Sequence, residues 1–152
     1  MRASADGVYH EKVAGSFYEL LEHPADVGFR AYGETLPQLF AHSALALLSI
    51  AGDPSAIQPR WDYPLTVQSS DWESLMVDWL SEVLYWYDGK RIGFHDFRVL
   101  ELEPQRIRAV GIGEPRVSGR HPEKLIVKAV TYHQLKVEAR EGIWVAEVYL
   151  DV

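Results

Sequence analysis

The chain has 152 residues, a length that suits a single domain with a sizeable hydrophobic core. Lys and Arg total 15 against 22 Asp and Glu, and the net charge of −7 argues against a broad electrostatic grip on nucleic-acid phosphates or on an anionic membrane. The absence of cysteine excludes disulfides, thiolate metal ligands and thiol nucleophiles. Because we find neither a secretory signal nor a run of about 18 apolar residues, we expect a cytoplasmic protein without membrane contact.

The N-terminal part of the chain divides into an extension and the start of a domain. Residues 1–15 are small and polar, so we expect a flexible extension there, followed by a single domain over residues 16–152. Short β-prone segments at 17–21 and 28–32 then flank a turn with the sequence His-Pro-Ala-Asp-Val-Gly.

Two amphipathic helices follow, separated by a predicted strand at 61–67. In the first, leucines recur at helical spacing between Thr35, the predicted N-cap, and a glycine-containing loop that begins at Gly52. In the second, Ser70 and Glu73 have the spacing of a capping box, and the apolar stripe that follows ends at Asp88-Gly89.

From residue 94 onward the pattern is typical of β-strands. We predict strands at 98–103, 106–112, 125–132, 135–140 and 143–150, the last two joined by a Glu-Gly hairpin signal. The 125–132 segment is apolar on both faces and is therefore predicted to be a central strand. Two helices among about seven hairpin-linked strands indicate an α+β fold, with the helices packed on a mostly antiparallel, mixed β-sheet layer.

Acidic residues and a histidine mark two places far apart in the sequence. His23 and Asp26 stand three residues apart in the turn, and the chain ends at Asp151 and Val152, which add a side-chain carboxylate and an α-carboxylate. Oxygen ligands suit Ca²⁺, Mg²⁺ or Mn²⁺, and a histidine nitrogen favours Mn²⁺ or Zn²⁺. His23 and Asp26 fit two metal ligands, or a base and its orienting carboxylate. Equally, Asp26 fits a turn cap before Gly28 and the acidic end a solvated terminus.

Three further residues are weighed as partners of this acidic set. Lys128 lies inside the apolar 125–132 segment, where a lysine must either snorkel or pair with a carboxylate. Beside an acidic cluster it could tune the cluster or hold a phosphate. His121 and His133 could join His23, although an isolated histidine is more often a hydrogen-bonded core or surface residue.

The sequence contains no other recognisable catalytic motif. The glycines of segment 111–115 lack the strand–loop–helix setting and the Lys-Ser/Thr ending of a phosphate loop. We find no Ser-His-Asp arrangement and no nucleophile elbow, so no residue is predicted to be catalytic and the protein is not predicted to be an enzyme by itself.

Four separated stretches, taken together, resemble the archease family. They are segments 18–33, 79–85, 127–133 and 150–152, which occur in the family order and at family-like spacing. The similarity covers nearly all of the chain from residue 17 to 152.

The resemblance implies a small α+β protein that assists the GTP-dependent RNA ligase of tRNA splicing and RNA repair. Such a protein promotes guanylylation and multiple turnover of the ligase, does not join RNA itself, and meets RNA only through the ligase. The family's divalent-cation site is matched here by Asp26, Asp151 and Val152, with Ca²⁺, Mg²⁺ or Mn²⁺ as the ion. Lys128 corresponds to a lysine near that site, and His23 belongs to the same turn.

The sequence differs from the archease pattern at two places, and two other functions are also consistent with it. Pro24 stands where archeases often have Thr, and Val117-Ser118 stands where relatives commonly carry an additional acidic residue, so loop 114–121 is not assigned to the site. The alternative functions are a stand-alone metal-dependent phosphoester hydrolase that uses His23 and Asp26, and a chaperone-like binding protein without a metal role.

Overall fold

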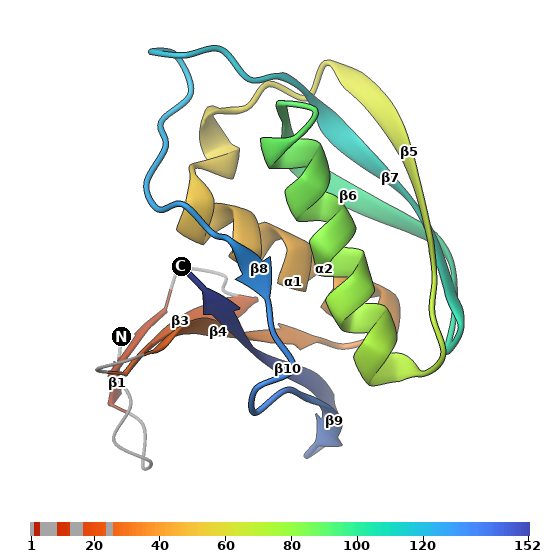
Figure 1. Ribbon diagram of the computed structural model, residues 1–152. Helices are drawn as coiled ribbons and strands as arrows, with labels where there is room; N and C mark the ends of the chain where they lie inside the picture. Colours follow the sequence, from red (N-terminus) through yellow and green to blue (C-terminus); the bar gives the residue numbers. More distant parts are fainter. Residues whose placement is uncertain (1, 4–8, 13–16, 24–25) are drawn as a thin grey trace.

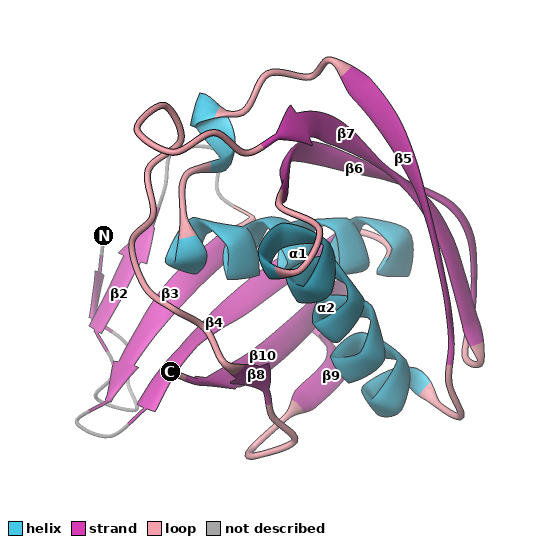
Figure 2. Ribbon diagram, turned by 45° about the horizontal axis from the view of Figure 1, so that its top comes forward, coloured by secondary structure: helices cyan, strands magenta, loops and turns pink. Residues whose placement is uncertain are grey.

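Two β-sheets enclose a pair of helices in this protein. The structure, a computed structural model, describes residues 2–3, 9–12, 17–23 and 26–152; for residues 2–3, 9–12, 22–23 and 26 it describes the backbone alone. The helices lie between a seven-stranded sheet and a three-stranded sheet (Figures 1 and 2), which confirms the predicted α+β class. The strand pairs that the described residues form are antiparallel.

The larger sheet has the order β1-β2-β3-β4-β10-β8, with β9 also paired to β10, and the smaller sheet has the order β5-β7-β6. The strands of the larger sheet are β1 (Arg2–Ala3), β2 (Tyr9–Lys12), β3 (Tyr18–His23), β4 (Asp26–Gly33), β8 (Ala129–Val130), β9 (Lys136–Arg140) and β10 (Ile143–Asp151). The other elements are α1 (Leu36–Ala51), the 3₁₀ turn η1 (Pro54–Ala56), β5 (Trp61–Gln68), α2 (Trp72–Asp88), β6 (Ile92–Glu103) and β7 (Arg106–Pro115).

Local sequence explains where the helices begin. The predicted N-cap Thr35 is confirmed, since its hydroxyl accepts a hydrogen bond from the Gln38 N–H at 3.2 Å. The capping box predicted from Ser70 is wrong by one residue. Asp71 caps α2 instead and accepts from the Ser74 N–H at 2.8 Å, because a carboxylate interacts more favourably than a hydroxyl with the positive end of a helix.

Neither helix of the described part of the chain has the length and apolar character needed to span a membrane.

The core lies between the helices and both sheets. Trp79 of α2 is fully buried at its centre, and its indole N–H donates to the Phe40 carbonyl of α1 at 2.9 Å. A buried indole needs such a partner, so this bond fixes the two helices against each other. Phe29 of β4 and Phe94 of β6 bring the two sheets into the same cluster.

The structure differs from the sequence-based expectations at two segments. The first is the N-terminal region predicted to lie outside the fold, where β1 and β2 occur and β2 pairs with β3. The second is the predicted central strand 125–132, which is wrong. Only β8 forms there, at the edge of the larger sheet, and Leu125 and Ile126 are 40% and 76% exposed. A bond from the Lys124 N–H to the Ala51 carbonyl holds this segment along α1, so that only its end reaches β10.

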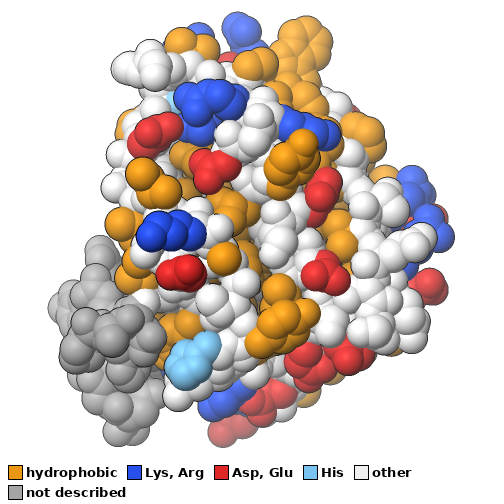
Figure 3. Space-filling model, viewed as in Figure 1, with side chains coloured by type: hydrophobic (Ala, Val, Ile, Leu, Met, Phe, Trp, Pro, Cys, Tyr) orange, Lys and Arg blue, Asp and Glu red, His pale blue; other side chains and the backbone are white. Residues whose placement is uncertain are grey.

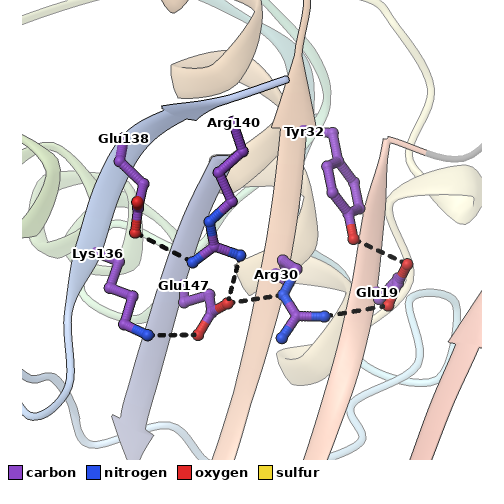
Figure 4. Close-up of polar contacts among 7 residues, drawn as sticks. All are labelled: Glu19, Arg30, Tyr32, Lys136, Glu138, Arg140 and Glu147. Carbon is purple, nitrogen blue, oxygen red and sulfur yellow. Dashed lines mark hydrogen bonds and ion pairs between the residues drawn. The ribbon is translucent and has the colours of Figure 1, made fainter. Parts of the chain in front are cut away.

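A ladder of charged side chains crosses the face of the larger sheet that points away from the helices (Figure 4). Its centre is Arg30 of β4, whose Nε donates to Glu147 of β10 at 2.8 Å and whose guanidinium lies 3.8 Å from Glu19 of β3. Both carboxylates are buried, with exposed fractions of 1% and 7%. The Tyr32 hydroxyl also donates to Glu19. Because buried charges must be paired, the ladder fixes the register of β3, β4 and β10.

Candidate metal centre

The two acidic positions predicted to share a metal ion meet at one end of the larger sheet. β4 begins at Asp26 and β10 ends at Asp151, and the two strands pair so that Leu150 lies opposite Val27. One further step in this register places the backbones of Asp26 and Asp151 side by side. The predicted site requires this backbone arrangement. The side chains of His23 and Asp26, and residues 24–25 between them, lie outside the described part of the chain.

The acidic end of the chain is held in the sheet as far as Asp151. Leu150 is buried in the core, and the Asp151 carbonyl accepts a hydrogen bond from the Lys128 N–H at 2.7 Å. Asp151 itself is exposed, as is Val152. An anchored backbone therefore presents hard oxygen donors at the sheet end, beside β8 in Figure 1, and such donors fit Ca²⁺, Mg²⁺ or Mn²⁺.

Lys128 lies at the sheet edge rather than in a central strand. It is exposed and lines a cleft of about 450 Å³ together with Ser81, Tyr85 and Asp88 of α2. The pairing of Asp151 with Ala129 places Lys128 one residue away from Asp151 along the edge. The Lys128 side chain lines the cleft beside α2, whereas Asp151 follows Leu150, which faces the core, and so points to the opposite face of the sheet. The backbone of Lys128 thus lies next to the acidic end of the chain. Its side chain extends along the cleft, where the ammonium group can contact a binding partner.

His121 and His133 are placed in other surroundings. His121 is 5% exposed, and its Nδ1 accepts from the Val117 N–H at 2.8 Å, so Nε2 carries the proton and donates to Glu114 at 3.0 Å. The His133 ring contacts the ring of Tyr149 edge-on, with 6.1 Å between centroids. Among residues whose side chains are described, which exclude His23 and Asp26, no three His, Cys, Asp or Glu side chains gather in a way that could hold a metal ion.

The buried pair of Glu114 and His121 was missed by sequence reasoning. Glu114, the penultimate residue of β7, accepts from the Gln58 N–H at 2.7 Å. This hydrogen bond, together with that from His121, lowers the pKa of its carboxyl group. The pair ties the loop after β7 to the body of the protein. No sequence spacing marks it, because the contact depends on how residues 116–121 turn back onto β7.

A comparison with known protein families gives a match over the whole domain. Residues 18–152 match the model of the Archease protein family (MTH1598/TM1083). Archeases of Methanosarcina mazei and Methanosarcina acetivorans are 39% and 40% identical to this chain, and each alignment covers 91% of it and 97% of the relative. The archease of Pyrococcus furiosus is 35% identical, over 89% of this chain and 98% of its own length.

Two solved structures are similar to the fold. The solution structure of Methanobacterium thermoautotrophicum protein 1598 superposes with a TM-score of 0.76 at 30% identity, covering 90% of this chain and 99% of that one. The crystal structure of a Thermotoga maritima archease, described as a possible chaperone, superposes with a TM-score of 0.61 at 19% identity, covering 86% and 94%. The family match over nearly the full chain, joined to these relatives, shows that this chain belongs to the archease family.

Proposed function

We propose that this protein is an accessory factor that activates a GTP-dependent RNA ligase, promoting guanylylation of the ligase and its multiple turnover. Membership in the archease family supports the proposal. The main structural support is the register of β4 and β10, which pairs Leu150 with Val27 and so brings the strand ends that carry Asp151 and Asp26 to the same end of the sheet. The net charge of −7 also suits contact with a basic, RNA-binding partner.

A divalent cation is the proposed cofactor at this end. Asp26, Asp151 and the α-carboxylate of Val152 would hold it through oxygen atoms, with His23 as a neighbouring nitrogen donor. When bound, the ion supplies positive charge that phosphate oxygens of a nucleotide can meet. The chain's own contribution is to hold the ligands in place, since β10 is anchored by Leu150 and by the bond between Lys128 and Asp151.

The direct test compares the protein alone with the protein added to the ligase. Alone, it is expected neither to seal RNA nor to hydrolyse GTP above background, because no nucleophile and base pair is legible. Added at about one tenth of the ligase concentration, it is expected to raise product beyond one turnover per ligase molecule, measured by gel-based ligation with labelled RNA. GTP hydrolysis by the lone protein would favour the hydrolase alternative. Activation that survives loss of the metal ligands would favour chaperone-like binding, the role that the Thermotoga maritima description suggests.

The exposed position of Lys128 gives a separate prediction. Lys128→Met keeps most of the apolar stem and removes the charge, so the free energy of unfolding is expected to change by no more than about 0.5 kcal/mol. Activation of the ligase is expected to fall about tenfold, the effect of losing one contact worth roughly 1.4 kcal/mol. Thermal unfolding and multiple-turnover ligation, measured together, check both parts.

Lys124→Met is the matched control, because Lys124 is an exposed lysine of the same loop. It is expected to leave ligation unchanged. Equal ligation by both variants and the natural protein would mean that Lys128 serves only as an edge residue of the sheet.

A further inference from the structure

A second charged site lies at the other end of the loop that carries Lys128. The loop leaves β7, turns at residues 117–121 and then runs down to β8 (Figure 1). Where it turns, a cleft of about 390 Å³ opens between the loop and Arg91, which lies in the short connection between α2 and β6. Figure 3 shows several Lys and Arg side chains near this end of the molecule, although the whole chain has a net charge of −7. The cleft is lined by Arg91, Arg116, Val117, Ser118, Gly119, His121, Pro122 and Glu123.

Arg116 is the fixed part of this cleft. Its side chain is 3% exposed, and its guanidinium carbon lies 3.9 Å above the ring of Tyr87. Its Nε donates to the Tyr87 carbonyl at 3.1 Å, which fixes the plane of the guanidinium group. A stacked and hydrogen-bonded guanidinium is pre-organised for a planar or tetrahedral oxyanion, because little rotamer freedom remains to be lost.

The anion that Arg116 meets is a carboxylate at the surface. Glu123 accepts from Arg116 at 2.8 Å and lies 4.0 Å from the guanidinium of Arg91, while its side chain is 63% exposed. The hydrogen bond from Arg116 also holds the pKa of Glu123 below its usual value. Two guanidinium groups thus contact one carboxylate. The exposed Glu123 side chain can rotate into solvent, whereas Arg116 is held in the cleft by its contacts with Tyr87.

The backbone around the cleft leaves room for a ligand. Arg91 has a left-handed backbone conformation, with φ of 59°, and its carbonyl accepts from the Arg116 N–H at 2.7 Å. Such a conformation is unfavourable for a residue with a side chain and is often found at binding sites. Gly119 has φ of 82°, and no atom lies within 4 Å of the place its Cβ would take.

We propose that this cleft binds a phosphate monoester group between Arg91 and Arg116, with Glu123 as an internal competitor that occupies the same position when phosphate is absent. Two guanidinium groups offer paired N–H donors to phosphate oxygens, and a phosphate dianion satisfies two cations where one carboxylate satisfies only half of their charge. The site goes beyond the proposed ligase activation and is separate from the acidic end of β10. It gives an acidic protein a defined place for one phosphate group without a broad basic surface.

Titration of the full-length protein with inorganic phosphate at low ionic strength, followed by calorimetry and by amide NMR shifts, tests the site. Saturable binding is expected, with the largest shifts at Arg91, Ser118 and Gly119. Glu123→Gln removes the competing charge and keeps an acceptor for Arg116, so phosphate affinity is expected to rise about tenfold; Arg91→Gln is expected to lower it about tenfold. Arg91→Gln leaves the bond between Arg116 and Glu123 in place, so it tests the site even if Glu123→Gln fails to fold.

Matched controls lie on the smaller sheet. Glu101 is also an exposed carboxylate between two arginines, at 2.9 Å from Arg108 and 3.4 Å from Arg106, but it is not part of the cleft. Glu101→Gln and Arg98→Gln are expected to leave phosphate binding unchanged. No saturable binding by either the natural protein or Glu123→Gln up to ~10 mM phosphate would overturn the proposal. Equal effects of Glu101→Gln and Glu123→Gln would also overturn it, since they would indicate general electrostatics.

A comparison of probes identifies the source of the phosphate. A nucleoside 3′-monophosphate that binds more tightly than inorganic phosphate would indicate a nucleotide, and equal affinities would indicate free phosphate. The same nucleoside without its phosphate is expected not to bind. Binding of that nucleoside with similar affinity would contradict a phosphate site.

Discussion

Replacing Asp151 with Asn is expected to abolish multiple-turnover activation of the ligase while leaving the fold intact. The substitution keeps the shape of the side chain and removes one of the proposed anionic ligands. Divalent-cation affinity is expected to fall by about 100-fold or more, since even the loss of a residue that only supports a ligand commonly costs 10–100-fold. Because Asp151 is exposed, the free energy of unfolding should change by no more than about 0.5 kcal/mol. Calorimetric titration with Ca²⁺ and Mn²⁺, beside multiple-turnover ligation, measures both effects.

The control is Asp62→Asn, which neutralises an exposed aspartate of β5 and lowers the net negative charge by the same amount. It is expected to leave cation binding and activation unchanged. Asp26→Asn should behave like Asp151→Asn, and a tag added after Val152 should weaken binding where an N-terminal tag does not. If Asp151→Asn and Asp62→Asn activate the ligase equally well, the proposed metal site is incorrect.

Arg30→Met is expected to be the most destabilising single change on the face of the sheet that points away from the helices. It removes the cation between the buried carboxylates of Glu19 and Glu147. Breaking a buried ion pair by removal of one partner costs about 3–5 kcal/mol, because the remaining charge stays out of water. Glu147 keeps Arg140 at 3.3 Å and Lys136 at 4.0 Å, so the cost is expected at the lower end of this range. At this chain length the cost corresponds to a fall of roughly 6–20 °C in the unfolding temperature. Chemical denaturation, analysed for the midpoint and slope, measures the loss directly.

A surface arginine provides the comparison for Arg30. Arg108 donates to Glu101 at 2.9 Å, but the two side chains are 43% and 52% exposed. Water screens such a pair, so Arg108→Met is expected to cost no more than about 1 kcal/mol. Similar losses in the two variants would show that the charged ladder contributes no more than an ordinary surface pair.

Local sequence determined the helices, the hairpins and therefore the α+β class. Helix ends follow from the residues that satisfy the first free N–H groups, and those lie within three positions of the cap, as Thr35 shows. The hairpin between β9 and β10 forms at Glu141-Gly142 because both residues accept positive φ there, at 50° and 81°. The cap of α2 lies at Asp71, one residue after the predicted Ser70, because a carboxylate interacts more favourably than a hydroxyl with the positive end of the helix.

Sequence alone also selected residues for the candidate site, but not their surroundings. The family resemblance predicts that Asp26 and Asp151 are neighbours. Their backbone proximity depends on the register of β4 against β10, to which the pair of Arg30 and Glu147, 117 residues apart, contributes. The apolar run around Lys128 predicted burial, whereas the attachment of Lys124 to α1 leaves that run at an edge.

Only the tertiary structure decided the second cleft and the buried pair beneath it. The contact of Arg116 with Tyr87 joins residues 29 positions apart, and that of Glu114 with Gln58 joins residues 56 apart. Side-chain pairs at such separations carry no periodic signal, because their geometry is set by how whole elements pack rather than by the neighbours of each residue along the chain. Charge and composition fixed the net acidity of this protein, while the packing of loop 116–121 onto α2 and β7 concentrated two arginines on one exposed carboxylate.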